Sequence, residues 1–364
     1  MTIEVQYAYS GIYIETSDQA VNLQNTVVDT DPSDSPFLWG VPVVDWPASI
    51  LYFLNGNDLI YLSGNFNDDV YAGSGDDEVS AGGGDDIISG AAGDDFLQGE
   101  DGNDTLSGDT GSDTLFGGGG LDTMYGGVGS DAMSGGDDAD TMYGGTEGDE
   151  MGGDDGDDII RGQAGDDELN GGAGNDSLQG GLGSDGIFGD IGNDDIRGGA
   201  GDDQLNGWDG DDVIRGNIGN DQIEGGIGDD VLNGGFGDDQ LTGGLGADIL
   251  SGGQDNDLYY YEFAADSTAL AAGRDTITQF ETGLDVIDVA DVDAKAGSLT
   301  INEAFIWLGE AAAFTAASQV RLQLDGTGNT LVLFNTNNNF ATVEMAILIQ
   351  NILPSELSAS DFYL

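Results

Sequence analysis

Aspartate recurs at every ninth position from Asp68 to Asp257, and the residue two places after each one is apolar. This spacing gives 22 consecutive repeats with the consensus Gly-Gly-x-Gly-(Asp or Asn)-Asp-x-apolar-x, as in residues 171–179. Carboxylates and main-chain carbonyls are hard oxygen ligands, which suit calcium or magnesium better than transition metals. The spacing therefore predicts a regular series of metal sites built from oxygen.

The chain contains neither cysteine nor histidine. This composition excludes disulfides and cysteine metal sites, and it removes the usual zinc ligand and general base. Serine hydrolase and zinc protease chemistry both lose their histidine. A pair of carboxylates as in glycosidases is compatible with the composition, but no zone outside the repeats is large enough to build the cleft. We therefore expect no enzymatic activity.

Seventy acidic residues against six basic ones give a formal charge of −64. Such self-repulsion holds a polar, glycine-rich chain expanded unless something neutralises it, so a counter-ion is expected to be part of the fold. Nucleic acid is not an expected partner, because it needs a basic surface.

The repeat itself predicts a fold. Clustered glycines allow positive φ and a tight turn in which carbonyls converge, and the three residues after each aspartate form a very short strand whose central apolar side chain points inward. Two repeats complete a turn of 18 residues, so residues i and i+18 stack and their strands pair in parallel. We predict an all-β, right-handed parallel β-roll (a β-solenoid) of about 11 turns, with calcium held between the loops of neighbouring turns.

The predicted calcium ligands are the repeat aspartates, with two exceptions. The repeats of Asp140 and Asp149 are left out, because Asp138 and Glu147 replace their fourth-position glycine, and calcium is expected to bind there poorly or not at all. The predicted ligands are Asp68, Asp77, Asp86, Asp95, Asp104, Asp113, Asp122, Asp131, Asp158, Asp167, Asp176, Asp185, Asp194, Asp203, Asp212, Asp221, Asp230, Asp239, Asp248 and Asp257.

Composition divides the chain into three zones. Residues 1–54 hold four of the five prolines and short alternating stretches, which predict an N-terminal capping region with a Pro-rich loop. Residues 55–259 are the repeat array, beginning with an early unit around Asp58 that is followed by a one-residue insertion. Residues 260–364 lose the glycines and regain alternating apolar runs, which predict a C-terminal β cap.

The third position of each repeat is expected to face solvent, yet late in the array it becomes apolar. Two edges of the roll then carry apolar side chains, which we expect to dock the C-terminal zone or another molecule, with harmless loop variation as the alternative. These residues are Leu182, Ile218 and Phe236 on one edge and Ile191, Ile227 and Leu245 on the other.

The nonapeptide consensus resembles the calcium-binding repeat of RTX (hemolysin-type) proteins. Residues 255–364 resemble the C-terminal region of serralysin-type secreted metalloproteases. The matching elements are Asp275-Thr276-Ile277, Phe280, Gly283, Asp285, Ile287-Asp288, Asp293-Ala294, Ala304-Phe305, Leu308-Gly309, Gly328-Asn329-Thr330-Leu331-Val332 and Asp361-Phe362-Tyr363-Leu364.

In that family this region caps the β-roll and carries an uncleaved C-terminal signal for type I secretion, which ends in an acidic residue and three apolar ones. The ending Asp361-Phe362-Tyr363-Leu364 fits this pattern, whereas the protease half is absent because its zinc motif needs histidines. The resemblance implies a chain that stays unfolded where calcium is scarce, leaves through a type I exporter and folds outside the cell when calcium binds.

The leading expectation is therefore a secreted, extracellular calcium-binding RTX protein with a structural or interaction role at the cell surface or in the matrix. No apolar run approaches the roughly 18 residues of a membrane span, and the N-terminus lacks the features of a cleavable signal peptide. The alternative is a polysaccharide-binding or matrix-assembly module, for which Trp39, Trp46 and Trp208 are candidate stacking residues. A toxin or pore former is a weaker alternative.

Overall fold

The computed structural model describes residues 6–8, 11–13, 26–28, 50–52, 55–62, 64–262, 266–268, 271–290, 292, 306–308, 319–335, 343 and 345–364. The chain divides into two compact units, Met1–Ala173 and Gly174–Leu364. Both units consist of β-strands, and the only helical elements among the described residues are three short 3-10 turns.

The strands of unit 1 are three residues long at its start and six residues long in the repeats. They are β1 (Gln6–Ala8), β2 (Gly11–Tyr13), β3 (Thr26–Val28), β4 (Ile50–Tyr52), β5 (Leu59–Tyr61), β6 (Asp69–Ser74), β7 (Glu78–Gly83), β8 (Ile87–Ala92), β9 (Phe96–Asp101), β10 (Thr105–Thr110), β11 (Thr114–Gly119), β12 (Thr123–Val128), β13 (Ala132–Asp137), β14 (Thr141–Thr146), β15 (Glu150–Asp155), β16 (Ile159–Ala164) and β17 (Glu168–Ala173).

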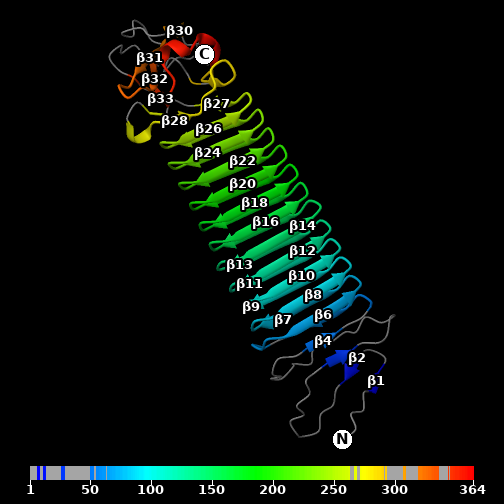
Figure 1. Cartoon of the computed structure of the whole chain (residues 1–364). Coiled ribbons are helices and arrows are strands. Elements are labelled where there is room, and N and C mark those ends of the chain that lie inside the picture. Colours follow the sequence, from blue (N-terminus) through cyan, green and yellow to red (C-terminus); the bar gives the residue numbers. More distant parts are fainter. Residues whose placement is uncertain are drawn as a thin grey trace, which may run out of the picture. The chain divides into compact units, whose positions relative to one another are not determined.

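Two parallel sheets run through unit 1, as Figure 1 shows. The even-numbered strands from β4 to β16 form one sheet and the odd-numbered strands from β5 to β17 form the other. Paired residues in the repeats lie 18 positions apart, as Leu106 and Met124 do. At the start of the unit β3 pairs in parallel with β4, and β1 pairs with β2 as a separate antiparallel ribbon.

Unit 2 continues the same strand pattern and adds the C-terminal elements. They are β18 (Ser177–Leu182), β19 (Gly186–Ile191), β20 (Asp195–Ala200), β21 (Gln204–Asp209), β22 (Val213–Ile218), β23 (Gln222–Ile227), β24 (Val231–Phe236), β25 (Gln240–Leu245), β26 (Ile249–Gln254), β27 (Leu258–Tyr260), the 3-10 turn η1 (Ala271–Gly273), β28 (Thr276–Thr278), β29 (Val286–Asp288), β30 (Ile306–Trp307), β31 (Gln319–Leu324), β32 (Thr330–Asn335), β33 (Met345–Ile349), η2 (Pro354–Glu356), η3 (Ala359–Asp361) and β34 (Phe362–Tyr363).

The C-terminal strands of unit 2 close both of its sheets. Strand β28 adds to β26 and β29 adds to β27, both in parallel. An antiparallel meander of β31, β32 and β33 follows, and β33 pairs in parallel with β28. The last strand of the chain, β34, pairs in parallel with β29. The predicted fold class is therefore confirmed: the chain is an all-β parallel roll of about 11 turns with a β cap.

The predicted length of the repeat strands is wrong. Each strand is six residues long and continues from the seventh position of one repeat through the third position of the next, rather than stopping after three residues. The ladder includes residues of the Gly-Gly-x segment, for example Asp109 opposite Gly127 and Thr110 opposite Val128. Those glycines therefore belong to the sheet, and only the fourth to sixth positions form the turn.

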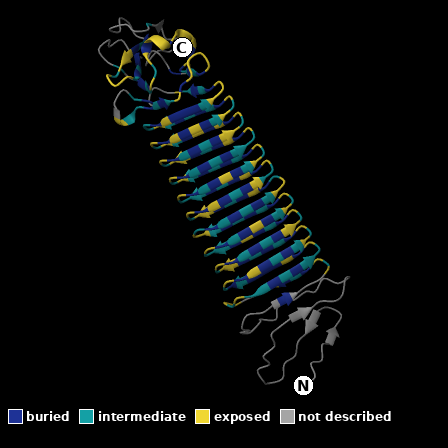
Figure 2. Cartoon of the chain, in the orientation of Figure 1, coloured by how far each residue is buried: buried dark blue, intermediate teal, exposed yellow. Residues whose placement is uncertain are grey.

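The core of each unit is the stack of apolar residues at the eighth position. These side chains are almost entirely buried in both units, for example Leu106, Met142 and Ile214 at 0% exposure. Their neighbours on either side face outward, so buried and exposed residues alternate along each strand, as Figure 2 shows. This alternation is the period of two that an extended strand imposes.

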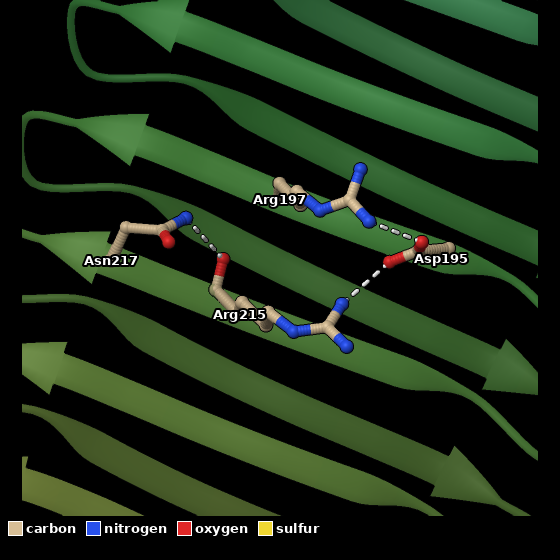
Figure 3. Close-up of polar contacts among 4 residues, drawn as sticks. All are labelled: Asp195, Arg197, Arg215 and Asn217. Atoms are coloured by element: carbon tan, nitrogen blue, oxygen red, sulfur yellow. Dashed lines mark hydrogen bonds and ion pairs between the residues drawn. The ribbon is translucent and has the colours of Figure 1, made fainter.

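The outer face of β20 and β22 carries a small ion-pair cluster, drawn in Figure 3. The Asp195 carboxylate accepts from Arg197 Nη2 at 2.5 Å and from Arg215 Nη1 at 2.7 Å. Asn217 Nδ2 donates to the Arg215 carbonyl at 3.3 Å. All three charged side chains are about two-fifths exposed, so each pair is expected to contribute on the order of 1 kcal/mol or less.

The apolar third-position residues of unit 2 face solvent, as predicted. Their exposed fractions run from 46% for Leu245 to 63% for Ile191, so the described part of residues 260–364 does not cover them. Docking of another molecule on these edges stays a hypothesis.

Trp208 is half exposed, whereas Trp39, Trp46 and the Pro-rich loop lie outside the described residues. No helix in the described part of the chain has the length and apolar character needed to cross a membrane.

Candidate metal centres

The sixth-position aspartates lie inside the roll, at the turn that precedes each strand. Asp104, Asp212 and Asp230, for example, are at most 1% exposed. Their burial follows from the strand period: the eighth position points inward, and so does the sixth. Each nine-residue repeat therefore places one carboxylate in the interior.

One carboxylate oxygen of each buried aspartate is fixed by the preceding turn of the roll. Oδ1 accepts the backbone N–H of the aspartate 18 residues earlier, for example Asp203 N to Asp221 Oδ1 at 2.9 Å and Asp212 N to Asp230 Oδ1 at 2.8 Å. The same bond recurs through the repeats of both units. It orients each carboxylate and leaves the second oxygen for another partner.

That second oxygen, Oδ2, is buried and has no hydrogen-bond partner. An unpartnered buried carboxylate oxygen costs several kcal/mol, so a regular series of them indicates a ligand. The aspartates with this feature are Asp77, Asp86, Asp95, Asp104, Asp113, Asp122, Asp131, Asp140 and Asp149 in unit 1, and Asp194, Asp203, Asp212, Asp221, Asp230, Asp239, Asp248 and Asp257 in unit 2.

Glycine at the first position makes room for this oxygen. A Cβ added at Gly216 would overlap Asp221 Oδ2 and would lie 2.8 Å from the Gly234 carbonyl of the next turn. The first two repeats tolerate alanine instead, since Ala72 and Ala81 stand at this position. First-position glycine is thus required by space, and not by a left-handed backbone.

Glycine at the fourth position has a different cause. Gly192 has φ of 139°, and a Cβ there would overlap the carbonyl oxygen of Gly174 in the turn below. The turns therefore stack backbone on backbone, which brings their carbonyls close to the aspartate. Main-chain carbonyls and carboxylates together make the oxygen-rich ligand set that calcium prefers.

The buried aspartates resist ionisation without a cation. Burial raises the pKa of Asp203 to about 7 and that of Asp230 to about 8. The N–H of the neighbouring turn lowers these pKa values, and adjacent aspartates raise them again. A bound cation would reverse the effect of burial, because it favours the charged carboxylate.

The fifth position forms a second, exposed ladder that runs in the opposite direction. Asp211 Oδ1 accepts the N–H of Asp229, and Asn220 Oδ1 accepts the N–H of Asp238, in both cases from the following turn. Either an amide or a carboxylate oxygen can make this bond, which explains why both asparagine and aspartate occur here. The fifth position therefore stacks turns, while the sixth faces the interior.

The structure also buries two aspartates that are not among the predicted calcium ligands. Asp140 and Asp149 are buried like the other members, and their Oδ1 atoms accept from Asp122 N at 2.7 Å and Asp131 N at 2.9 Å. Their loops keep the shape because Asp138 and Glu147 adopt φ of 72° and 69° in place of glycine. Aspartate adopts this left-handed conformation more readily than most residues do, so Asp138 itself was a signal in the sequence that its loop could form.

Two aspartates at the start of the array differ from the rest. Asp68, a predicted ligand, is only half-buried, although its N–H donates to Asp86 Oδ1 at 2.6 Å. Asp58, in the early unit, is 3% exposed, and its N–H donates to Asp77 Oδ1 across 19 residues because of the inserted residue. Among the described residues no three acidic side chains converge on one point, so each centre would combine carboxylates with main-chain carbonyls.

A family model described as the RTX calcium-binding nonapeptide repeat matches residues 62–97, 98–133, 117–151, 152–187, 188–223 and 224–259. The chain belongs to this RTX family. The repeats are therefore calcium-binding repeats, and the buried oxygen-only donors fit that ion. In the RTX array of this chain the sixth-position carboxylates and the turn carbonyls would hold calcium, which neutralises the interior charge and satisfies Oδ2.

The solved structures that match this chain include two subunits of a mannuronan C5-epimerase from Azotobacter vinelandii. AlgE6R3 is 21% identical over 46% of this chain and 77% of that chain, with a TM-score of 0.30. AlgE6R2 is 24% identical over 46% and 90%, with a TM-score of 0.27. The extracellular lipase LipA of Serratia marcescens is 18% identical over 67% of this chain and 40% of that chain, with a TM-score of 0.17. No curated protein matches the sequence.

Proposed function

We propose that this chain is a secreted, non-enzymatic calcium-binding protein whose RTX array folds when calcium binds outside the cell. The observation that carries the proposal is the repeated buried Oδ2 without a hydrogen-bond partner. A calcium-free roll would have to bury these carboxylates either charged and unpaired or protonated. Calcium removes this penalty, so the free energy of binding becomes free energy of folding.

Export through a type I exporter is the second part of the proposal. The C-terminal ending that resembles a secretion signal is built into the fold: β34 pairs with β29, and Asp361 accepts from Gly283 N at 2.9 Å and from Ser358 N at 2.6 Å. An exporter that reads this ending would therefore meet it before the chain folds. In cells that carry a type I exporter, deletion of residues 361–364 is expected to abolish appearance of the chain in the medium.

The decisive experiment is a calcium titration of the purified chain, followed by far-UV circular dichroism, with magnesium as the control. We expect a cooperative coil-to-β transition near millimolar calcium and none with magnesium, because extracellular calcium modules commonly bind in the 10⁻⁴ to 10⁻³ M range. A chain that is fully folded in chelator at pH 7.5, or indifferent to calcium, would overturn the proposal.

A structural or interaction role at the cell surface or in the extracellular matrix follows from this proposal. Polysaccharide binding is the second candidate, and the observation that favours it is the half-exposed indole of Trp208 on β21. Aromatic rings of this kind stack on sugars. Retention of the calcium-loaded chain on immobilised anionic polysaccharide, lost on Trp208→Ala, would support this role, and absence of retention would rule it out.

A further inference from the structure

The outer surface of β10, β12, β14 and β16 in unit 1, here called the neutral face, is almost free of acidic residues. Strands β12, β14 and β16 contain none, and β10 contains only Asp109. The strands β11, β13, β15 and β17 of the other sheet hold five acidic residues and no basic one. These are Asp137, Glu150, Asp154, Asp155 and Glu168. In a chain with a formal charge of −64, one face of the roll is therefore kept uncharged.

Tyrosine and arginine side chains form an ordered row on the neutral face. The ladder aligns Ser107, Tyr125, Tyr143 and Arg161 on successive strands. The rings of Tyr125 and Tyr143 stack with centroids 5.1 Å apart and an interplanar angle of 6°. Arg161 Nη1 donates to the Tyr143 hydroxyl at 3.0 Å, and the guanidinium carbon lies 5.3 Å from the ring centroid. Tyrosine and arginine are enriched at protein interfaces, and side chains already held by neighbours lose less entropy on binding.

The rows beside these side chains are uncharged and partly apolar. The seventh position carries Thr105, Thr123, Thr141 and Ile159, and the third carries Thr110, Val128, Thr146 and Ala164. Tyr125, Val128 and Ile159 are exposed by 43%, 52% and 37%. A polyanion would call for several cations on this face, whereas it has one. The neutral face therefore fits a partner surface that is itself nearly uncharged.

The two charges on the neutral face lack an ionic partner in their own chain. Among the described residues Arg161 forms no ion pair, and Asp109 accepts from the hydroxyls of Ser89 and Ser107 at 2.9 and 3.0 Å. Asp109 lies on β10 and Arg161 on β16, the two outermost of the four strands. A two-fold axis parallel to the strands, between β12 and β14, exchanges β10 with β16. It would bring Arg161 of each copy over the strand that carries Asp109 of the other.

We propose that the neutral face is the interface of a two-fold dimer of this chain, in which Arg161 of each copy pairs with Asp109 of the other. Two sheets can pack face to face in this way, with Tyr125 of one copy over Tyr143 of the other. Elsewhere on unit 1 the acidic strands of two copies would repel each other. Four six-residue strands span roughly 20 Å by 19 Å, so the two faces together cover about 800 Å², the size of a weak, reversible interface. This inference rests on the proposed function, because the array must first fold with calcium.

Sedimentation velocity of the full chain in saturating calcium tests the pairing. We expect a monomer–dimer equilibrium with a Kd on the order of 10 µM. Arg161→Glu and Asp109→Lys are each expected to sediment as a monomer, because each variant places like charges opposite one another. An equimolar mixture of the two is expected to dimerise, because their charges are complementary at both contacts. Asn170→Glu is the matched control: it adds a carboxylate at the same position of the next repeat, in the other sheet, and is expected to dimerise like the wild type.

Far-UV circular dichroism in calcium separates a failure to pair from a failure to fold. A wild-type chain that gains β-structure with calcium but sediments as a monomer at about 100 µM would overturn the dimer and leave the proposed function intact. Folded single variants whose mixture stays monomeric would also overturn it. If either charge variant does not fold, Thr141→Glu places a carboxylate at the centre of the face and is expected to raise the Kd at least about tenfold. An unchanged Kd for this variant would overturn the proposal, and a wild-type chain that stays unfolded in calcium would overturn the proposed function as well.

Discussion

Adjacent acidic residues have different physical roles in this roll. The fifth-position side chain is exposed and needs only an acceptor oxygen, so Asn193 and Asn220 replace aspartate without loss of the bond to the next turn. The sixth-position side chain is buried and presents a second oxygen that no protein group satisfies, as at Asp221. Asparagine never occurs at the sixth position between Asp68 and Asp257.

This contrast leads to a prediction at two positions in successive repeats. We expect Asp221→Asn to raise the calcium midpoint of folding and to lower stability by about 2 kcal/mol in saturating calcium, because an amide removes a charged ligand and places an N–H₂ group among oxygens. Asp211→Asn keeps the acceptor for Asp229 N and is expected to change stability by less than about 0.5 kcal/mol. Calcium titration followed by denaturant unfolding measures both, and equal effects of the two substitutions would contradict the assigned roles.

At the scale of the turn, backbone stacking is a second constraint on the sequence, beside the metal ligands. Gly192→Ala would force a side chain into the carbonyl of Gly174 at a positive φ, so we expect a loss of about 3 kcal/mol or more. Gly152→Ala is the matched control, because no atom lies within 4 Å of the added Cβ, and it is expected to be neutral or slightly stabilising. Thermal unfolding in saturating calcium compares them, and a similar Tm for the two variants would mean that the turns can separate.

The repeat pattern was sufficient to predict the class of fold, because an inward position at every ninth residue and a turn of 18 leave few alternatives. It was insufficient to predict the strand length. The glycines suggested a turn, whereas ladder hydrogen bonds between neighbouring coils continue the strand through the first three positions of the next repeat. It also left the shape of the loops before Asp140 and Asp149 open, because the consensus does not show that Asp138 and Glu147 can adopt the left-handed conformation. Asp275 joins the stack of Asp248 across 27 residues and accepts from Leu348 N on β33, and no local spacing reveals either contact.

At the scale of the whole chain, the charge of −64 and the buried carboxylates make protons and calcium alternative neutralising ligands. Burial raises the pKa of Asp221 to about 6, that of Asp239 to about 7 and that of Asp230 to about 8, from an ordinary value of 3.8. Without calcium, the folded chain thus binds more protons than the unfolded chain between about pH 4 and pH 8. Its stability is present at the acidic end of this window and is lost as the pH rises through the folded pKa values.

Calcium reverses this dependence, because protons displace it from the carboxylates. We therefore expect the chain, after calcium is removed by dialysis, to gain β-structure as the pH is lowered from 8 to 5, and the calcium midpoint of folding to rise over the same range. Circular dichroism at a series of pH values, with and without calcium, measures both trends, and a magnesium series controls for general screening of charge. If the calcium-free chain were equally unfolded at pH 5 and pH 8, the buried carboxylates would not be what limits folding. Self-repulsion among the exposed acidic residues would then have to explain the need for calcium.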